Sequence, residues 1–361
     1  MTTTHADATP APTPTPGRRR PGGGLGSYLV VRFLLIFPTI LILVTTVFVM
    51  MRATGDPITA SLGGRLTPEQ LDERISAAGY DRPILVQYLD YLGGILRGDF
   101  GTTISDNRPV TEVLVTYGTA TLELAVYALA VALLVGIPLG RLAAARRDRG
   151  VDATLRVSAV VVYATPVFFA GMLLKLVFSV WLGWLPVAGR ASTGTEIAMQ
   201  RDGAGTGIYL VDAISTGDPE AVSDVLQHAV LPALALGLLT AGVFLRLVRT
   251  NVIGTLATGY VEAARSRGVG ERRLLRKHAW RPALVPIITV IGLQIAMLLA
   301  GAVLTETTFE WKGLGFQLVQ YLLARDYVAV QGMVAMLAVI VALTNFLVDV
   351  VAALVDPRVR Y

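Results

Sequence analysis

Long apolar runs alternate with short polar segments through most of this sequence. Four runs contain no Asp, Glu, Lys or Arg, namely 33–51, 229–245, 283–305 and 327–348. Two further runs, 119–139 and 157–185, carry one charge each, Glu123 and Lys175. A helix needs roughly 20 predominantly apolar residues to cross a bilayer, whereas buried helices of soluble proteins are matched by shorter runs. The pattern therefore predicts an all-α integral membrane protein with six transmembrane helices. Their approximate bounds are 30–51, 119–140, 155–185, 228–247, 283–305 and 327–350.

Composition supports lipid as the main solvent of the chain. Hydrophobic residues make up 53% of its 361 positions and charged residues only 16%, with a mean hydropathy of +0.60. Soluble domains carry about 25% charged residues. The absence of cysteine excludes disulfides and thiolate metal sites.

The polar loops differ in charge, which predicts an orientation. With six spans, both termini share one side with the second and fourth loops. These segments are rich in Arg, and the stretch from Arg246 to Arg281 around the fourth loop has nine Lys or Arg against Glu262 and Glu271. Because basic loops are retained in the cytoplasm, we expect both termini to be cytoplasmic. The net charge of +5 then reflects topology and does not indicate nucleic-acid binding.

Three segments lie outside the predicted bundle. Residues 1–27 are rich in Thr, Pro, Ala and Gly, which predicts a disordered tail. The membrane domain is expected to comprise residues 28–361, and its first span is expected not to be cleaved. Residues 52–118 form an external segment in which Thr67 is a predicted N-cap followed by Pro68 and Gln70. Residues 186–226 are expected to be an external loop, with a new helix starting at Asp218. We expect both external segments to serve as a docking surface or lid.

Several chemistries are excluded by the residues present. The three His are too far apart in sequence for an HExxH zinc site, and none of the three Lys follows a glycine, so the chain has no P-loop. No convergent set of nucleophile and base is found within the spans, which argues against a membrane-embedded enzyme. The chain is therefore predicted to be non-catalytic, with no cofactor of its own.

Polar residues inside membrane spans are costly and often line a pathway. The candidates are Glu123, Lys175, Gln294, Asn345 and Asp349. Structural roles are favoured for three of them: Glu123 close to a helix start, Lys175 extending to an interface, and Asp349 beside the C-terminal arginines. Gln294, in the middle of the fifth span, is the best pathway-lining candidate.

The fourth loop, residues 251–282, has the most distinct polar pattern. A short helix is predicted after Thr258, a break at Gly268 and Gly270, and a second helix over 271–280. Small residues on the first helix would let another protein approach closely. Residue spacing alone leaves two interpretations open: a helix–glycine–helix unit that docks into a partner, or a basic loop held at anionic headgroups.

The sequence of this loop resembles the EAA motif of ABC importer permeases, in Glu262-Ala263-Ala264 followed by Gly268. The neighbouring RKHAWRPALVPIITVIGLQ is similar to the branch that imports dipeptides, oligopeptides and nickel, although Pro282 departs from that pattern. Matches continue nearly to both ends in RATGDP (52–57), TETTFEWKGLG (305–315), ARDYVAVQG (324–332) and VDPRVRY (355–361). They resemble the first permease subunit of peptide importers.

The resemblance implies a type I ABC importer fold in the plasma (inner) membrane. The coupling residues it implies are Glu262, Ala263, Ala264, Arg265, Ser266, Gly268 and Val269. The implied partners are a second permease, two P-loop ATPases that bind ATP and Mg, an extracytoplasmic binding protein, membrane lipid and a peptide substrate, with no nucleic acid. Nickel, glutathione or opine import in the same architecture and a stand-alone secondary transporter are the alternatives.

Overall fold

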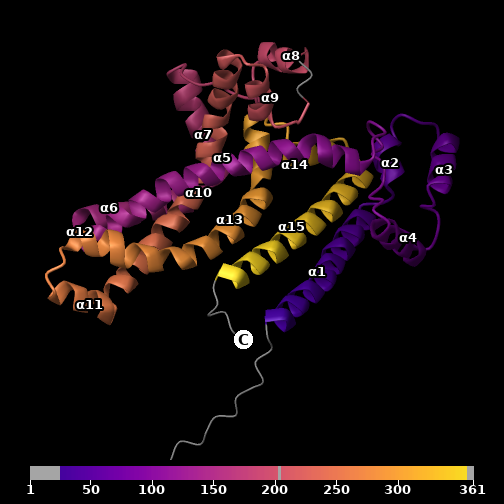
Figure 1. Cartoon of the computed structure of the whole chain (residues 1–361). Coiled ribbons are helices and arrows are strands. Elements are labelled where there is room, and N and C mark those ends of the chain that lie inside the picture. The colour runs from indigo at the N-terminus through magenta and orange to yellow at the C-terminus, as the bar shows by residue number, and fades with distance from the viewer. Residues whose placement is uncertain (1–24, 202–204, 356–361) are drawn as a thin grey trace, which may run out of the picture.

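The computed structural model describes residues 25–201 and 205–355, and these form helices joined by short connections (Figure 1). Of the predicted tail, residues 1–24 lie outside the described part of the chain. Residues 25–27 already belong to the first helix, α1 (Leu25–Ala53).

The predicted spans correspond to the long helices. Besides α1 these are α5 (Val110–Ala145), α10 (Pro219–Leu256), α13 (Trp280–Phe309) and α15 (Tyr327–Val355). Among the described residues, α1, α5, α10 and α15 are long and apolar enough to cross a membrane as single helices. Up to six spans result if each of two bent pairs forms one span, namely the helices over 150–181 and the two parts of α13, which meet at 48°. Most of these helices are several residues longer than their apolar runs, because polar residues at their ends continue the helix beyond the part that matches the thickness of the bilayer.

The expected continuous span over 155–185 is two helices in the structure. α6 (Gly150–Ala164) and α7 (Val167–Leu174) meet at an angle of 102°, and a π-helical segment, η1 (Lys175–Trp181), continues α7. The break falls at Pro166, which cannot donate a backbone hydrogen bond. The preceding Thr165 has the extended conformation (ψ 125°) that proline favours in its neighbour.

The most extensive helix contact joins α5 to α10. Glycines allow their backbones to approach closely. A Cβ added at Gly140 would lie 2.7 Å from the Leu245 carbonyl oxygen, and one added at Gly237 would lie 2.6 Å from that of Ala128. Membrane helices gain no hydrophobic driving force from association in lipid, so such close packing is a main source of their cohesion.

A second pair, α1 and α15, packs along the side of this core. Near its end, Arg32 of α1 lies 3.4 Å from Asp349 of α15. The predicted neighbours of Asp349, Arg358 and Arg360, lie outside the described residues. The apolar window of α1 is only 17% buried, so the rest of the described chain leaves most of this helix uncovered.

The polar segments gather at two ends of the bundle. The basic end carries α11 (Gly259–Ser266), α12 (Glu271–Arg273) and the π-helical η2 (Leu274–Ala279). The acidic end carries the helices between spans (Figure 1). These are α2 (Pro57–Leu62), α3 (Pro68–Ala77), α4 (Ile84–Leu96), α8 (Thr193–Arg201), α9 (Tyr209–Ser215) and α14 (Leu314–Leu323).

Two predicted helix starts at the acidic end are confirmed. Thr67 caps α3 and exchanges hydrogen bonds with Gln70 as a capping box, and Asp218 caps α10 by accepting from Glu220 N–H at 2.8 Å. The predicted loop 186–226 is in contrast partly helical. α8 and α9 fold against the start of α10 around a small core that includes Met199, Ala213 and Val225.

Because Gly140 sits against α10, we predict that Gly140→Val lowers stability. The added side chain must displace the Leu245 backbone or the Val248 side chain, and overpacking of this kind costs about 1–3 kcal/mol. Thermal unfolding in detergent measures the change. Gly254→Val is the matched control, since Gly254 lies on α10 and a Cβ added there would have nothing within 4 Å. Equal melting temperatures for the two variants would contradict the close-packing account.

Candidate functional site

The predicted helix–glycine–helix unit is present at the basic end; we call residues 258–279 the EAA segment. Thr258 stands at the N-cap of α11 in an extended conformation, but its hydroxyl donates to the Thr255 carbonyl at 2.6 Å and does not cap the helix. After α11, Gly268 has φ +79°, where L side chains are strained. Gly270 has φ −63°, an ordinary value. Only the first of the two predicted glycines is therefore needed for the backbone turn.

The EAA segment is fixed to the bundle by a small apolar core. Val261, Ala264 and Leu274 are buried together, and Leu256 at the end of α10 packs against them. The Tyr260 hydroxyl also donates to the His278 carbonyl oxygen at 3.2 Å. Since these contacts join α11 to α10 and η2, a force on α11 is transmitted to the long helices on both sides.

The opposite face of the EAA segment is exposed. Most of the predicted coupling residues lie on it: Glu262, Ala263, Arg265, Ser266 and Gly268, whereas Ala264 is buried and Val269 half-buried. Arg265 Nε donates to Glu271 Oε1 at 2.7 Å across the glycine turn. This hydrogen bond holds the pKa of Glu271 below and that of Arg265 above their usual ranges. Both side chains face solvent, so the pair orients the turn and adds little stability.

Gln294 lies on α13 and is 9% exposed. Its amide nitrogen is 3.8 Å from the sulfur of Met297, one turn further along the same helix. The next residue towards the basic end, Leu293, is 48% exposed, as a lipid- or partner-facing position would be.

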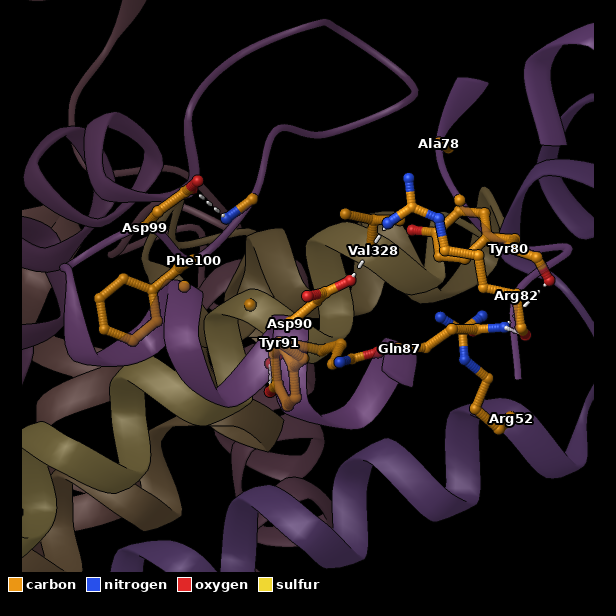
Figure 2. Close-up of a pocket in the computed structure, with 15 residues that line it drawn as sticks. Arg52, Ala78, Tyr80, Arg82, Gln87, Asp90, Tyr91, Asp99, Phe100 and Val328 are labelled. Carbon is orange, nitrogen blue, oxygen red and sulfur yellow. Dashed lines mark hydrogen bonds and ion pairs between the residues drawn. The ribbon is translucent and has the colours of Figure 1, made fainter. Parts of the chain in front are cut away.

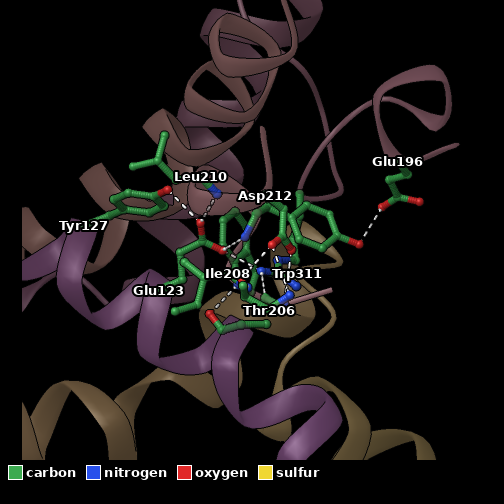
Figure 3. A network of polar contacts seen from close by, with 12 residues as sticks. Glu123, Tyr127, Glu196, Thr206, Ile208, Leu210, Asp212 and Trp311 are labelled. Atoms are coloured by element: carbon green, nitrogen blue, oxygen red, sulfur yellow. Dashed lines mark hydrogen bonds and ion pairs between the residues drawn. The ribbon is translucent and has the colours of Figure 1, made fainter. Parts of the chain in front are cut away.

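At the acidic end, a buried ion pair fastens residues 186–201 and 205–218 to the bundle (Figure 3). Arg190 Nη2 lies 2.5 Å from Glu123 Oε2 and donates to the Gly207 carbonyl at 2.8 Å. The Arg190 guanidinium carbon is 3.6 Å from the ring centroid of Tyr209. Glu123 also accepts from Tyr127 O–H at 2.8 Å and Leu210 N–H at 2.9 Å.

The predicted role of Glu123 near a helix start is wrong. α5 begins at Val110, so Glu123 lies well inside the helix and is paired with Arg190. The apolar run alone does not predict this pair. Residues 110–118 are mixed in polarity, so the predicted span starts at residue 119 although the helix begins at Val110. One signal was available: Arg190 and Arg201 are the only basic residues in 186–226.

Two other buried carboxylates join distant parts of the chain. Glu306 of α13 accepts from Thr121 O–H of α5 at 2.6 Å and from Phe316 N–H of α14 at 2.9 Å. Asp326 accepts from Ile104 N–H and Ser105 N–H, both at 2.7 Å. The motifs TETTFEWKGLG and ARDYVAVQG thus supply the connections that hold the acidic end together.

Lys175 is half-buried, and its side chain has a partner at the end of another helix. Its ammonium donates to the Thr308 carbonyl at 2.7 Å, where α13 ends, a position at which the helix dipole favours a cation. Across the described ranges, no group of three His, Asp or Glu side chains is arranged to hold a metal ion.

Comparison with known proteins relates this arrangement to a family. Residues 136–361 match the binding-protein-dependent transport system inner membrane component, and residues 26–124 match the N-terminal part of such membrane components. The chain belongs to this family. It is thus a multi-pass inner-membrane permease subunit of an ABC transporter, a non-catalytic component in a system whose partner ATPases bind the ATP.

Individual relatives match nearly end to end. The dipeptide transport system permease protein DppB of Escherichia coli K12 is 38% identical, over 92% of this chain and 98% of the relative. The di/tripeptide permease DppB of Pseudomonas aeruginosa UCBPP-PA14 is 35% identical, over 93% and 99%. The oligopeptide permease AppB of Bacillus subtilis 168 is 32% identical, over 93% and 100%.

A solved structure supports the fold. A chain of the MetNI methionine ABC transporter, in inward-facing conformations, matches with a TM-score of 0.50 and 16% identity, over 68% of this chain and 96% of that chain. The chain therefore has an all-helical ABC importer permease fold.

The left-handed turn at Gly268 gives a direct test of the EAA segment. Gly268→Val places a β-branched residue at φ +79°, where such a residue costs about 1–3 kcal/mol although nothing lies within 4 Å of the new Cβ. We expect faster amide hydrogen exchange in residues 259–273 and unchanged exchange in α5. Gly270→Ala, at an ordinary φ and also with open space, is the control. Equal protection in both variants would show that the turn does not depend on Gly268.

Proposed function

We propose that this chain is the membrane-spanning permease subunit of an ATP-driven importer of dipeptides or oligopeptides. The names of three relatives that match over more than nine-tenths of the chain support peptide as the substrate class. Recognition of peptide length and sequence then belongs mainly to an extracytoplasmic binding protein that delivers the substrate.

In this proposal the EAA segment couples the permease to ATPase subunits. The observation that carries it is the two-sided construction of α11: one face is buried against Leu256 and Leu274, and the other exposes Glu262 and Ala263. A short helix with small side chains, one face packed on the bundle and the other face exposed, suits insertion into a groove of a partner protein. Because Val261 and Ala264 of α11 pack against Leu274 of η2, and η2 continues directly into α13, movement of α11 reaches a membrane-spanning helix through these contacts.

The basic end faces the cytoplasm in this proposal. Arg267, Arg272, Arg273, Arg276 and Lys277 are all exposed there, as the positive-inside rule requires. The acidic end, with α8 and α9, then faces the binding protein. A second, related permease completes the pathway, and Gln294 lines it.

The docking role of α11 is tested by charge reversal. Glu262→Lys changes the exposed first turn of α11 without touching the buried contacts. We expect at least about tenfold weaker association of the ATPase subunits, equivalent to ~1.4 kcal/mol, and a corresponding loss of ATP-driven peptide uptake. Co-purification from membranes and uptake into proteoliposomes measure the two effects.

The matched control is Glu73→Lys, the same reversal on an exposed residue of α3 at the acidic end. This variant should retain the ATPase subunits. Normal ATPase association and uptake with Glu262→Lys would remove α11 from the coupling interface. Uptake driven by an ion gradient without any ATPase would instead support a secondary transporter.

The pathway role of Gln294 has a separate test. Gln294→Leu keeps a similar volume but removes the amide, so we expect altered peptide transport kinetics with normal assembly of the complex. Met297→Leu is the control, because it removes the sulfur beside the amide at nearly constant volume. Wild-type kinetics in Gln294→Leu would place this residue outside the pathway.

A further inference from the structure

Helix α4 has an amphipathic surface that the proposed function leaves unexplained. It lies at the acidic end beside the end of α1 (Figure 1). It runs for 13 residues, and none of them is fully buried. A helix with so much apolar surface in a polar external segment requires an explanation.

One face of α4 is attached to the bundle. The Tyr88 hydroxyl lies 2.6 Å from Thr45 Oγ1 of α1, and the Tyr88 ring centroid is 5.2 Å from that of Phe48. Tyr91 O–H donates to the Gln331 carbonyl of α15 at 3.4 Å. Partial burial raises the pKa of Tyr91 to about 12. α4 is therefore held in a defined position against α1 and α15.

A second face of α4 is polar and borders a cavity of about 320 Å³ (Figure 2). Gln87 Nε2 donates to the carbonyls of Arg82 and Tyr80 at 2.7 and 3.0 Å. Asp90 lies 3.4 Å from Arg82 Nη1. This face points towards water-accessible polar groups.

The third face is apolar and uncovered. Leu85, Leu89 and Leu96 are 68%, 58% and 86% exposed, and half-buried Leu92 lies between them. Their spacing of four, three and four residues places all four on one stripe of the helix. The charged Asp90 lies off this stripe.

The contact with Thr45 sets the level of α4 relative to the membrane. Thr45 precedes Arg52, the first charged residue after the apolar run of α1, by seven residues, or about 10 Å of helix. Neighbouring Ile42 and Val49 of α1 are 64% and 58% exposed, as lipid-facing residues are. The side chain of Tyr88 thus reaches α1 below the outer limit of its lipid-facing surface.

We propose that α4 lies in the plane of the membrane, at the boundary of headgroups and acyl chains on the acidic side, with its leucine stripe among the lipid acyl chains. Interfacial helices of this kind immerse their apolar face about 5–10 Å, which matches the level set by Thr45. The leucine stripe continues the lipid-facing surface of α1 around the end of the bundle. Arg97, exposed at the C-terminal end of α4, is placed to reach lipid phosphates.

The absence of cysteine from the chain makes the test direct. Single nitroxide labels are attached to Leu89→Cys, to Ile42→Cys on the lipid face of α1, and to Glu73→Cys on exposed α3. The full chain is placed in nanodiscs of phosphatidylcholine and phosphatidylglycerol, without partner proteins. Collision with oxygen, which concentrates in lipid, is compared with collision with a water-soluble nickel complex.

We expect the oxygen-to-nickel collision ratio at Leu89→Cys to be several-fold above that at Glu73→Cys and to approach that at Ile42→Cys. A ratio equal to that at Glu73→Cys would overturn the proposal. So would a label at Leu89→Cys that becomes protected only when the extracytoplasmic binding protein is added, since the stripe would then be a protein-docking surface. Leu96→Cys repeats the measurement at the most exposed position of the stripe, in case substitution at Leu89 disturbs folding.

Discussion

The close backbone contact between α5 and α10 is the constraint on which the rest of the structure depends. Without a hydrophobic driving force in lipid, helices cohere through packing and a few polar contacts. Gly140 and Gly237 remove the side chains that would separate these two helices. α10 begins in the small core beneath α8 and α9 and ends at the EAA segment. One rigid element therefore connects the acidic and basic ends of the molecule.

Buried carboxylates complete the connection at the acidic end. An isolated buried charge is expensive, and breaking a buried pair costs about 3–5 kcal/mol because the remaining charge is left uncompensated. Glu123, Glu306 and Asp326 each receive several hydrogen bonds from segments distant in sequence. Such groups favour one arrangement strongly, since any displaced arrangement leaves a carboxylate without donors.

The sequence predicts the long helices well because their driving force, transfer of apolar residues into lipid, is local and periodic. Helix starts with side-chain caps, such as Thr67 and Asp218, are also predictable, since their hydrogen bonds join residues two or three apart. The partner of Glu123 was not predictable in this way, because Arg190 comes from a segment without periodicity. The bend at Pro166 was likewise hidden within one long apolar run.

In the candidate site, too, features set by local sequence are predictable and features set by distant contacts are not. The EAA motif and the turn at Gly268 are visible in the sequence because glycine at a left-handed position is a local requirement. Which residues of α11 are buried depends on Leu256 and Leu274, which flank it on separate elements, and only the structure shows that Ala264 faces inward while Ala263 faces outward.

The π-helical turn of η2 has a consequence for how the faces of α13 are assigned. A π-helical hydrogen bond spans five residues where an α-helical one spans four, so each such turn accommodates one additional residue. One residue corresponds to about 100° of rotation in an α-helix. A helical wheel drawn with α-helical periodicity from α12 through Leu274–Ala279 into α13 therefore assigns the residues of α13 to the wrong faces. Positions on the two helices that a continuous helical wheel places on the same side are rotated away from each other in the molecule.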